Sequence, residues 1–207
     1  MAGVTTTPTK MTTRQVEVAA MGHFNYRQNL IVPNVSWGAG LHECDLLVVR
    51  LASLYGVEVE IKVSAADLKK DKDKRHGHRH HKLRELWFAM PSALEPHLDH
   101  VPERAGILLF DWHEYTYDDY NKRTKTWERV TDGHFQPRVV RKAQVNTGAV
   151  KFTDSEVEKI KHLGCMRIHT LLRKTEVVEL HNKELRAEIK KLKKELIKLQ
   201  PPEKETP

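Results

Sequence analysis

The chain has 207 residues, of which 39% are hydrophobic and 30% charged, and its formal net charge at pH 7 is +7. It contains no apolar run near the roughly 20 residues of a membrane-spanning helix, and residues 1–14 lack the apolar core of a signal peptide. The two distant cysteines, Cys44 and Cys165, exclude a disulfide framework and suit a reducing compartment. We therefore expect a soluble cytoplasmic protein that does not associate with a membrane. Its excess of Lys and Arg favours an anionic partner such as DNA.

The N-terminal part of the chain predicts a leader, a helix and a strand. Residues 1–12 are rich in threonine and lack periodicity, which predicts a disordered leader. A helix is expected from Arg14 to about Tyr26, because its apolar residues share one face. Glu17 on this helix is a possible accessory acid for a metal site, and an acid favoured by the helix dipole is the alternative. Asn29 to Val35 predicts a strand, in which Pro33 favours an edge position or a bend.

A β-hairpin is predicted in the middle of the chain by two apolar runs, Cys44 to Val49 and Val57 to Val63. Alternate side chains of a strand share a face. Glu58, Glu60 and Lys62 therefore lie opposite the valines of the second run. Charged groups on a central strand cost free energy unless something uses them.

The hairpin can place Asp45 of its first strand beside Glu60 of its second. Two carboxylates on neighbouring strands provide oxygen ligands for Mg²⁺ or Mn²⁺. Lys62 shares the face of Glu60 and can hold a nucleophilic water or offset charge at a phosphorus centre. This pattern indicates metal-assisted phosphodiester cleavage, and the alternative is an amphipathic strand with a solvated charged face.

The next segment begins with a helix near Ala65 and is strongly basic. Its acidic residues, Asp71 among them, are expected to be solvated. Its basic side chains predict contacts with phosphates, and the alternative is an exposed helix edge. The basic residues concerned are Lys69, Lys70, Lys72, Lys74, Arg75, Arg79 and Lys82. Four histidines offer the alternative of a Zn²⁺ or Ni²⁺ site, which the surrounding cations disfavour, at His76, His78, His80 and His81.

Further strands are predicted by the apolar runs Leu86 to Met90 and Ala105 to Trp112. The aromatic and basic stretch His113 to Arg129 favours an edge hairpin with its turn at Asn121 to Thr124. A surface that stacks on nucleic-acid bases is the alternative interpretation of this stretch.

The run VEIKVSAADLKKD at Val59 to Asp71, with ECDLLVV before it and LWFAMPSAL and AGILLFD after it, resembles the PD-(D/E)XK nuclease superfamily. The most similar members are the MmcB-like DNA-repair endonucleases and related phage-borne proteins. The resemblance implies an α/β, restriction-endonuclease-like domain over residues 13–142 with an α-β-β-β-α-β core. It also implies that Asp45, Glu60 and Lys62 are catalytic and that Asp45 and Glu60 hold Mg²⁺ or Mn²⁺, in a bacterial or phage-infected cell. Cys44 replaces the proline of the superfamily's name, and the His-rich insertion replaces an aromatic stretch.

The C-terminal part predicts a connecting segment over 143–152, a helical segment over 153–200 and a disordered tail over 201–207. Thr153 and Glu156 have the spacing of a capping box. Apolar residues then alternate at spacings of three and four, which predicts a coiled coil over about 168–199 and a parallel homodimer, with a seam at Leu171, Val178, Asn182, Leu185, Ile189, Leu192, Leu196 and Leu199. A single amphipathic helix packed on the core is the alternative.

These features predict a metal-dependent DNA endonuclease that acts in repair, recombination or phage DNA metabolism. The main alternative is a catalytically inactive nuclease-fold protein that binds DNA or serves as a scaffold. A third interpretation is a His-rich metal sensor.

Overall fold

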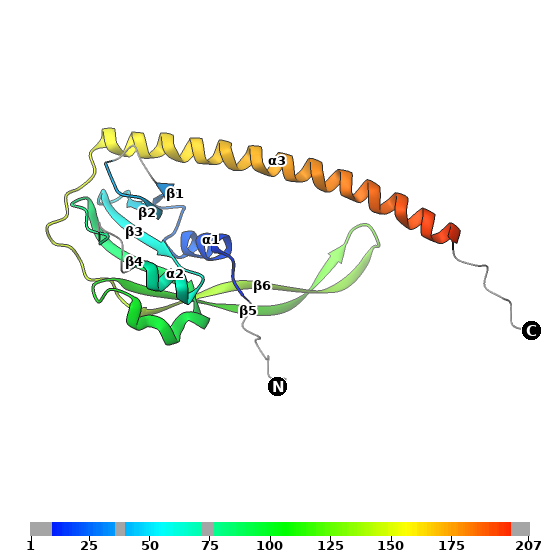
Figure 1. Ribbon diagram of the computed structural model, residues 1–207, viewed down its shortest axis with the longest axis horizontal. Coiled ribbons are helices and arrows are strands. Elements are labelled where there is room, and N and C mark those ends of the chain that lie inside the picture. The colour runs from blue at the N-terminus through cyan, green and yellow to red at the C-terminus, as the bar shows by residue number, and fades with distance from the viewer. Residues whose placement is uncertain (1–9, 36–39, 72–76, 200–207) are drawn as a thin grey trace, which may run out of the picture. The chain divides into compact units, whose positions relative to one another are not determined.

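The computed structural model describes residues 10–35, 40–71 and 77–199 (Figure 1). Within these ranges the chain forms a mixed α/β structure, as the sequence predicts, in which helices flank a six-stranded sheet. The elements follow in the order α1 (Thr13–His23), β1 (Leu30–Val35), β2 (Cys44–Arg50), β3 (Tyr55–Ile61), α2 (Ala65–Lys70), β4 (Leu83–Pro91), the 3₁₀ helix η2 (Ser92–His100), β5 (Gly106–Asn121), β6 (Thr126–Arg141) and α3 (Asp154–Leu199). Residues 1–9 of the expected leader and the whole tail lie outside the described residues. The end of the expected leader belongs to the fold, because Met11 is buried in the core and Thr12 caps α1.

The strands lie side by side in the same order as in the sequence, from β1 at one edge to β6 at the other. β1, β2 and β3 are antiparallel neighbours, β4 is parallel to both β3 and β5, and β5 and β6 form an antiparallel hairpin. Pro33 lies in the edge strand β1, as predicted, where a missing backbone donor is tolerated. From α1 to β4 the order of elements is α-β-β-β-α-β.

One face of the sheet is covered by α1. This helix begins with a capping box between Thr12 and Gln15, which satisfies backbone N–H groups of its first turn. Val16 and Ala20 on its inner face are fully buried, and they belong to a cluster with Val57 and Val59 of β3. This face of β3 is therefore apolar.

The opposite face carries two separate apolar clusters. The first joins β1 and β2 to the beginning of α3, and it includes Leu47, Val49, Phe152, Val157 and Ile160. The second joins β4 and β5 to α2 and η2, and it includes Leu68, Phe88, Met90, Leu94 and Leu109. β3 runs between them and carries charged side chains on this face.

β5 and β6 are each 16 residues long and continue beyond the buried part of the sheet as a two-stranded ribbon (Figure 1). Residues 106–110 are buried, whereas most residues from Asp111 to the turn are exposed. The rings of Trp112 and Phe135 lie 4.8 Å apart near the base of the ribbon. The turn between the strands follows Asn121, as the sequence predicts, and the aromatic side chains of the ribbon are largely exposed at Tyr115, Tyr117, Tyr120 and Trp127.

The chain divides into two compact units, Met1–Gly164 and Cys165–Pro207, and the boundary falls within α3. A Cβ atom at Gly164 would lie 3.4 Å from Cγ2 of Val32, so the first turns of α3 pass close to β1. None of the described helices combines the length and the apolar composition needed to cross a membrane.

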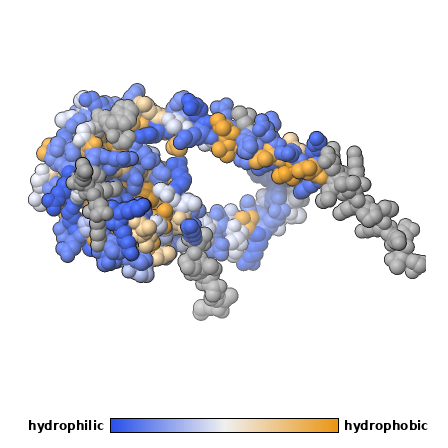
Figure 2. Space-filling model, in the orientation of Figure 1, coloured by the Kyte–Doolittle hydropathy of each residue, from blue (hydrophilic) through white to orange (hydrophobic). Residues whose placement is uncertain are grey.

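The second unit consists of a helix with exposed side chains. Its apolar positions appear as orange patches in Figure 2, and the seam residues with described side chains are all exposed in the single chain: Leu171, Val178, Asn182, Leu185, Ile189 and Leu192. The side chains of Leu196 and Leu199 lie outside the described part of the structure.

Candidate functional site

A stripe of charged side chains on β3 lies between the two apolar clusters. Glu58 and Glu60 are completely buried, and Lys62, which follows the end of β3, is 4% exposed. The backbone N–H of Lys62 donates to the carbonyl of Ala89 at 3.0 Å, so Lys62 extends the parallel pairing with β4. The predicted division of β3 into an apolar and a charged face is confirmed. The charged face is buried, however, and not solvated.

The three expected catalytic residues lie at the same end of the β2–β3 hairpin. Its antiparallel register pairs Leu46 with Val59, and Asp45 and Glu60 are the residues next to this pair. Oδ2 of Asp45 accepts a hydrogen bond from the backbone N–H of Ile61 at 2.8 Å. Nζ of Lys62 lies 2.9 Å from Oε2 of Glu60. The fold thus brings the Asp…Glu-x-Lys pattern together around the end of β3.

Lys62 has a second carboxylate partner, because its Nζ lies 2.8 Å from Oδ1 of Asp71. Burial by itself lowers the pKa of a lysine, but Glu60 and Asp71 outweigh this effect and raise the pKa of Lys62 above its usual value. Lys62 is therefore an ammonium at neutral pH. Such a group can offset developing negative charge, whereas it cannot accept a proton.

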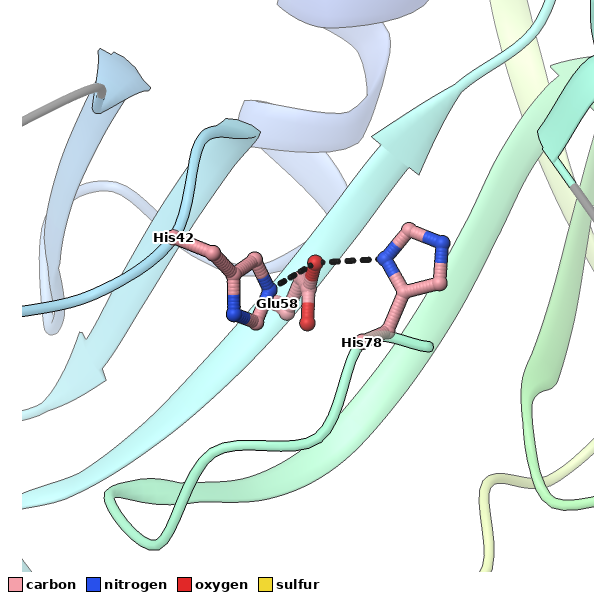
Figure 3. A group of neighbouring side chains, drawn as sticks. All are labelled: His42, Glu58 and His78. Atoms are coloured by element: carbon pink, nitrogen blue, oxygen red, sulfur yellow. Dashed lines mark hydrogen bonds and ion pairs between the residues drawn. The ribbon is translucent and has the colours of Figure 1, made fainter. Parts of the chain in front are cut away.

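Two histidines extend the network from the other end of the stripe (Figure 3). His42 Nε2 and His78 Nδ1 each lie 2.8 Å from Oε1 of Glu58, and His78 Nε2 lies 2.6 Å from Oδ2 of Asp71. Burial alone raises the pKa of Glu58, but the two histidines outweigh it and lower the pKa to about 2. Burial alone lowers the pKa of His78, but hydrogen bonds with Asp71 and Glu58 raise it to about 9. At neutral pH Glu58 is a carboxylate and His78 an imidazolium.

The position of His78 depends on an unusual backbone conformation. Gly77 and His78 both have positive φ values, 51° and 55°, in the left-handed region that side chains with a Cβ rarely adopt. Arg104 Nη2 donates to the carbonyl oxygens of both residues, at 2.7 and 2.8 Å. These two hydrogen bonds hold the segment so that the imidazole of His78 packs on the charged face of β3 and contacts Glu58. A pocket of about 530 Å³ beside it is lined by polar and basic residues that include His78, Arg79, His81, Arg104 and Asn146.

The burial of Asp71 and His78 differs from the sequence expectation of solvated or exposed side chains. The sequence could have identified Glu58 as a site residue, because alternation along a strand places Glu58 on the same face as Glu60. No local pattern identifies His42, Asp71 or His78 as its neighbours. His42 lies before β2, Asp71 after α2 and His78 before β4. These residues contact the charged side chains of β3 only in the folded chain.

Glu17 does not join this network. It lies on α1, which packs on the opposite face of the sheet, and its carboxylate pairs with Arg14 at 3.2 Å. Among the described residues, Glu17 belongs to neither group of potential metal ligands whose donor atoms lie within 4.8 Å of one another.

The basic residues expected to contact phosphates lie in different environments. Lys69, Lys70 and Arg79 are exposed. Lys82 is buried, and its Nζ donates to Oε2 of Glu156 at 2.9 Å and to the carbonyl of Lys151 at 3.0 Å. This ammonium therefore connects β4 to the beginning of α3 and is not presented to a ligand. Lys72, Lys74, Arg75 and His76 lie outside the described residues.

The donor atoms at the site suit divalent metals of two kinds. The carboxylates of Asp45 and Glu60 are of the oxygen type that Mg²⁺ and Mn²⁺ prefer. Among the described residues, Asp45 belongs to neither group of potential metal ligands whose donor atoms lie within 4.8 Å of one another. These two groups combine carboxylate oxygens with imidazole nitrogen: His42 with Glu58 and His78, and Glu60 with Asp71 and His78. Imidazole favours transition metals over Mg²⁺.

Comparisons of the chain with protein-family models, with curated proteins and with solved structures found no match. Of the motif residues singled out in the sequence, Asp45 lies in β2, Glu60 in β3 and Lys62 directly after β3.

Proposed function

We propose that the protein is a metal-dependent endonuclease that hydrolyses DNA phosphodiester bonds, in DNA repair, recombination or phage DNA metabolism. The observation that carries this proposal is the meeting of Asp45, Glu60 and Lys62 at one end of the β2–β3 hairpin. A carboxylate pair beside a buried ammonium suits the cleavage of a phosphodiester, in which negative charge develops at phosphorus. The net charge of +7 favours association with a polyanion.

Each of the three residues has a distinct role in this proposal. Asp45 and Glu60 would hold Mg²⁺ or Mn²⁺, which supplies Lewis-acid stabilisation of the transition state when bound. The hydrogen bond from Ile61 N–H orients the carboxylate of Asp45. Lys62 stays protonated and offsets negative charge, and its burial strengthens that interaction because the local dielectric constant is low.

The test is cleavage of supercoiled plasmid and of labelled single-stranded, duplex and branched oligonucleotides with Mg²⁺, Mn²⁺ or EDTA. We expect metal-dependent cleavage that Asp45→Asn lowers by ~10³-fold, or about 4 kcal/mol of transition-state stabilisation. This substitution removes a charge but keeps an oxygen that can accept the bond from Ile61, so the fold is preserved. DNA binding should change little.

Asp99→Asn is the matched control, because this carboxylate is 70% exposed and lies on η2 outside the site. It should cleave like the wild type. Equal cleavage by Asp45→Asn and Asp99→Asn would show that the site is assigned incorrectly.

The second candidate is a catalytically inactive DNA-binding or scaffold protein. The observation that favours it is burial: Glu58, Glu60, Lys62, Asp71 and His78 are at most 5% exposed, and they form ion pairs with one another. DNA binding without cleavage under every metal condition would favour this candidate over the endonuclease.

We also propose that two chains associate through a parallel coiled coil. The exposed apolar positions of α3 recur at coiled-coil spacing, and Asn182 lies at an a position, where one amide can fix register. A dimer would present two active sites to one duplex or to both of its strands.

A further inference from the structure

We propose that His42, Glu58 and His78 form a binding site for a divalent transition metal ion, with Zn²⁺ as the best match, separate from the Asp45–Glu60 pair. The two imidazole rings lie on either side of the Glu58 carboxylate (Figure 3). His42 Nε2 and His78 Nδ1 are each 2.8 Å from Oε1 of Glu58, and one ligand atom from each of the three residues lies within 4.8 Å of the others. Three donors at this spacing converge on a volume that one ion can fill.

The carboxylate at the centre of this group is ready to bind a cation. Glu58 is completely buried, and its carboxylate lies between the two imidazole rings. Its second oxygen, Oε2, accepts no hydrogen bond from the residues that the structure describes. A buried carboxylate oxygen without a donor is costly, and a metal ion satisfies it. This oxygen points to a ligand independently of the histidine spacing.

Asp71 is placed as the outer partner of a metal-binding histidine. While Nδ1 of His78 faces Glu58, its Nε2 lies 2.6 Å from Oδ2 of Asp71. Histidines that bind metals usually donate their second N–H to a carboxylate or a carbonyl, which fixes the ring and its tautomer. The clamp from Arg104 to the carbonyl oxygens of Gly77 and His78 supports the same orientation.

The alternative group of Glu60, Asp71 and His78 is a poorer metal site. Nζ of Lys62 lies 2.9 Å from Glu60 and 2.8 Å from Asp71, so one ammonium already pairs with both carboxylates. A divalent ion held by both carboxylates of this group would compete with the ammonium that contacts both of them. The imidazole of His78 can exchange its Nδ1 proton for a metal ion, whereas Lys62 cannot leave its position without exposing two buried carboxylates.

The donor set decides the class of metal. Two imidazole nitrogens and one carboxylate oxygen suit Zn²⁺ and related transition ions, whereas Mg²⁺ prefers oxygen ligands only. Binding replaces the Nδ1 proton of His78, and this proton is released to solvent. Zn²⁺ sites with three protein ligands keep a further position for water or another ligand.

The test is a titration of the metal-free full chain with Co²⁺, which reports its ligands through its visible spectrum, followed by competition with Zn²⁺. We expect one tight Co²⁺ site per chain, which Zn²⁺ displaces and excess Mg²⁺ does not. His42→Ala should weaken binding by ~100-fold or more, and Asp71→Asn by ~10- to 100-fold. His42→Gln provides a second variant of the same ligand, and circular dichroism confirms that each variant is folded.

His81→Gln is the matched control, because His81 is exposed in the same segment as His78. It should bind Co²⁺ like the wild type. Absence of a tight site in the wild-type chain would overturn the proposal, as would equal binding by folded His42→Ala and His81→Gln. No DNA is present in the titration, so its outcome is independent of endonuclease activity.

Discussion

Lys62 is positioned by two carboxylates in a region with almost no solvent. Its side chain is 5% exposed, and those of Glu60 and Asp71 are 1% and 2% exposed. Removing one partner of a buried ion pair leaves an uncompensated charge, which is more costly than the pair itself is stabilising. The residue proposed to act on the phosphodiester is therefore also required for stability.

We predict that Lys62→Met lowers the free energy of unfolding by ~3–5 kcal/mol, because Glu60 and Asp71 lose their common cation. Urea denaturation at neutral pH measures this effect. Lys161→Met is the control, since the exposed pair of Lys161 with Glu158 should contribute less than about 1 kcal/mol. Equal stability of the two variants would contradict the buried ion pairs.

His78 shows the limit of inference from individual residue types. Four histidines in a basic segment suggest either a metal site or exposed cations. In the structure His78 is buried between Glu58 and Asp71, whereas His81 is exposed. Nδ1 of His80 accepts a hydrogen bond from the backbone N–H of Lys82 at 3.1 Å. The residue types are the same, but the contacts that separate their roles come from other parts of the chain.

At the scale of elements, local sequence signals located most of the sheet and the beginning of α3. The capping box is present as predicted: Oε2 of Glu156 accepts from the backbone N–H of Thr153 at 2.7 Å, and Oγ1 of Thr153 accepts from the N–H of Glu156 at 3.3 Å. The ion pair of Glu156 with Lys82 is a tertiary addition, which the sequence pattern does not indicate.

The capping box predicts a dependence of stability on pH. Hydrogen bonds from Thr153, followed by the interaction with Lys82, lower the pKa of Glu156 from 4.5 to about 2. A lowered pKa gives stability that is present above the unfolded value of 4.5 and is lost as the pH falls toward 2. Because the side chain is 26% exposed, solvent screening limits the effect to about 1 kcal/mol.

Glu156→Gln should therefore be less stable than the wild type at pH 7, and the difference should shrink between pH 4.5 and pH 2. Unfolding by urea across this range measures it. Glu158→Gln is the control in the same turn of α3, because its carboxylate is 69% exposed. A difference that stays constant with pH would contradict the assignment.

At the scale of the whole molecule, the C-terminal unit exposes the apolar seam that a second chain would cover. We predict that the wild type has twice the 24.0 kDa mass of one chain in solution and that Ile189→Asp makes it monomeric, because a carboxylate at an a position would be buried in the seam. Light scattering after gel filtration measures the mass.

Val177→Asp is the matched control for the seam. Val177 is also an exposed β-branched residue of α3, 63% exposed compared with 51% for Ile189, but it lies outside the a and d positions. This variant should remain dimeric. A monomeric wild type at working concentration would contradict the coiled coil.

Local patterns in the sequence were sufficient to predict the mixed α/β class, the approximate strands, the charged face of β3 and the cap of α3. These features depend on alternation, turn residues and capping, which act over a few positions. The burial of this charged face is a property of the folded chain. So is the convergence on it of His42 and His78, which lie 16 and 20 positions from Glu58 in the sequence. That convergence depends on the backbone near Gly77 and on the Arg104 clamp, and such long-range contacts leave no periodic signal in the sequence.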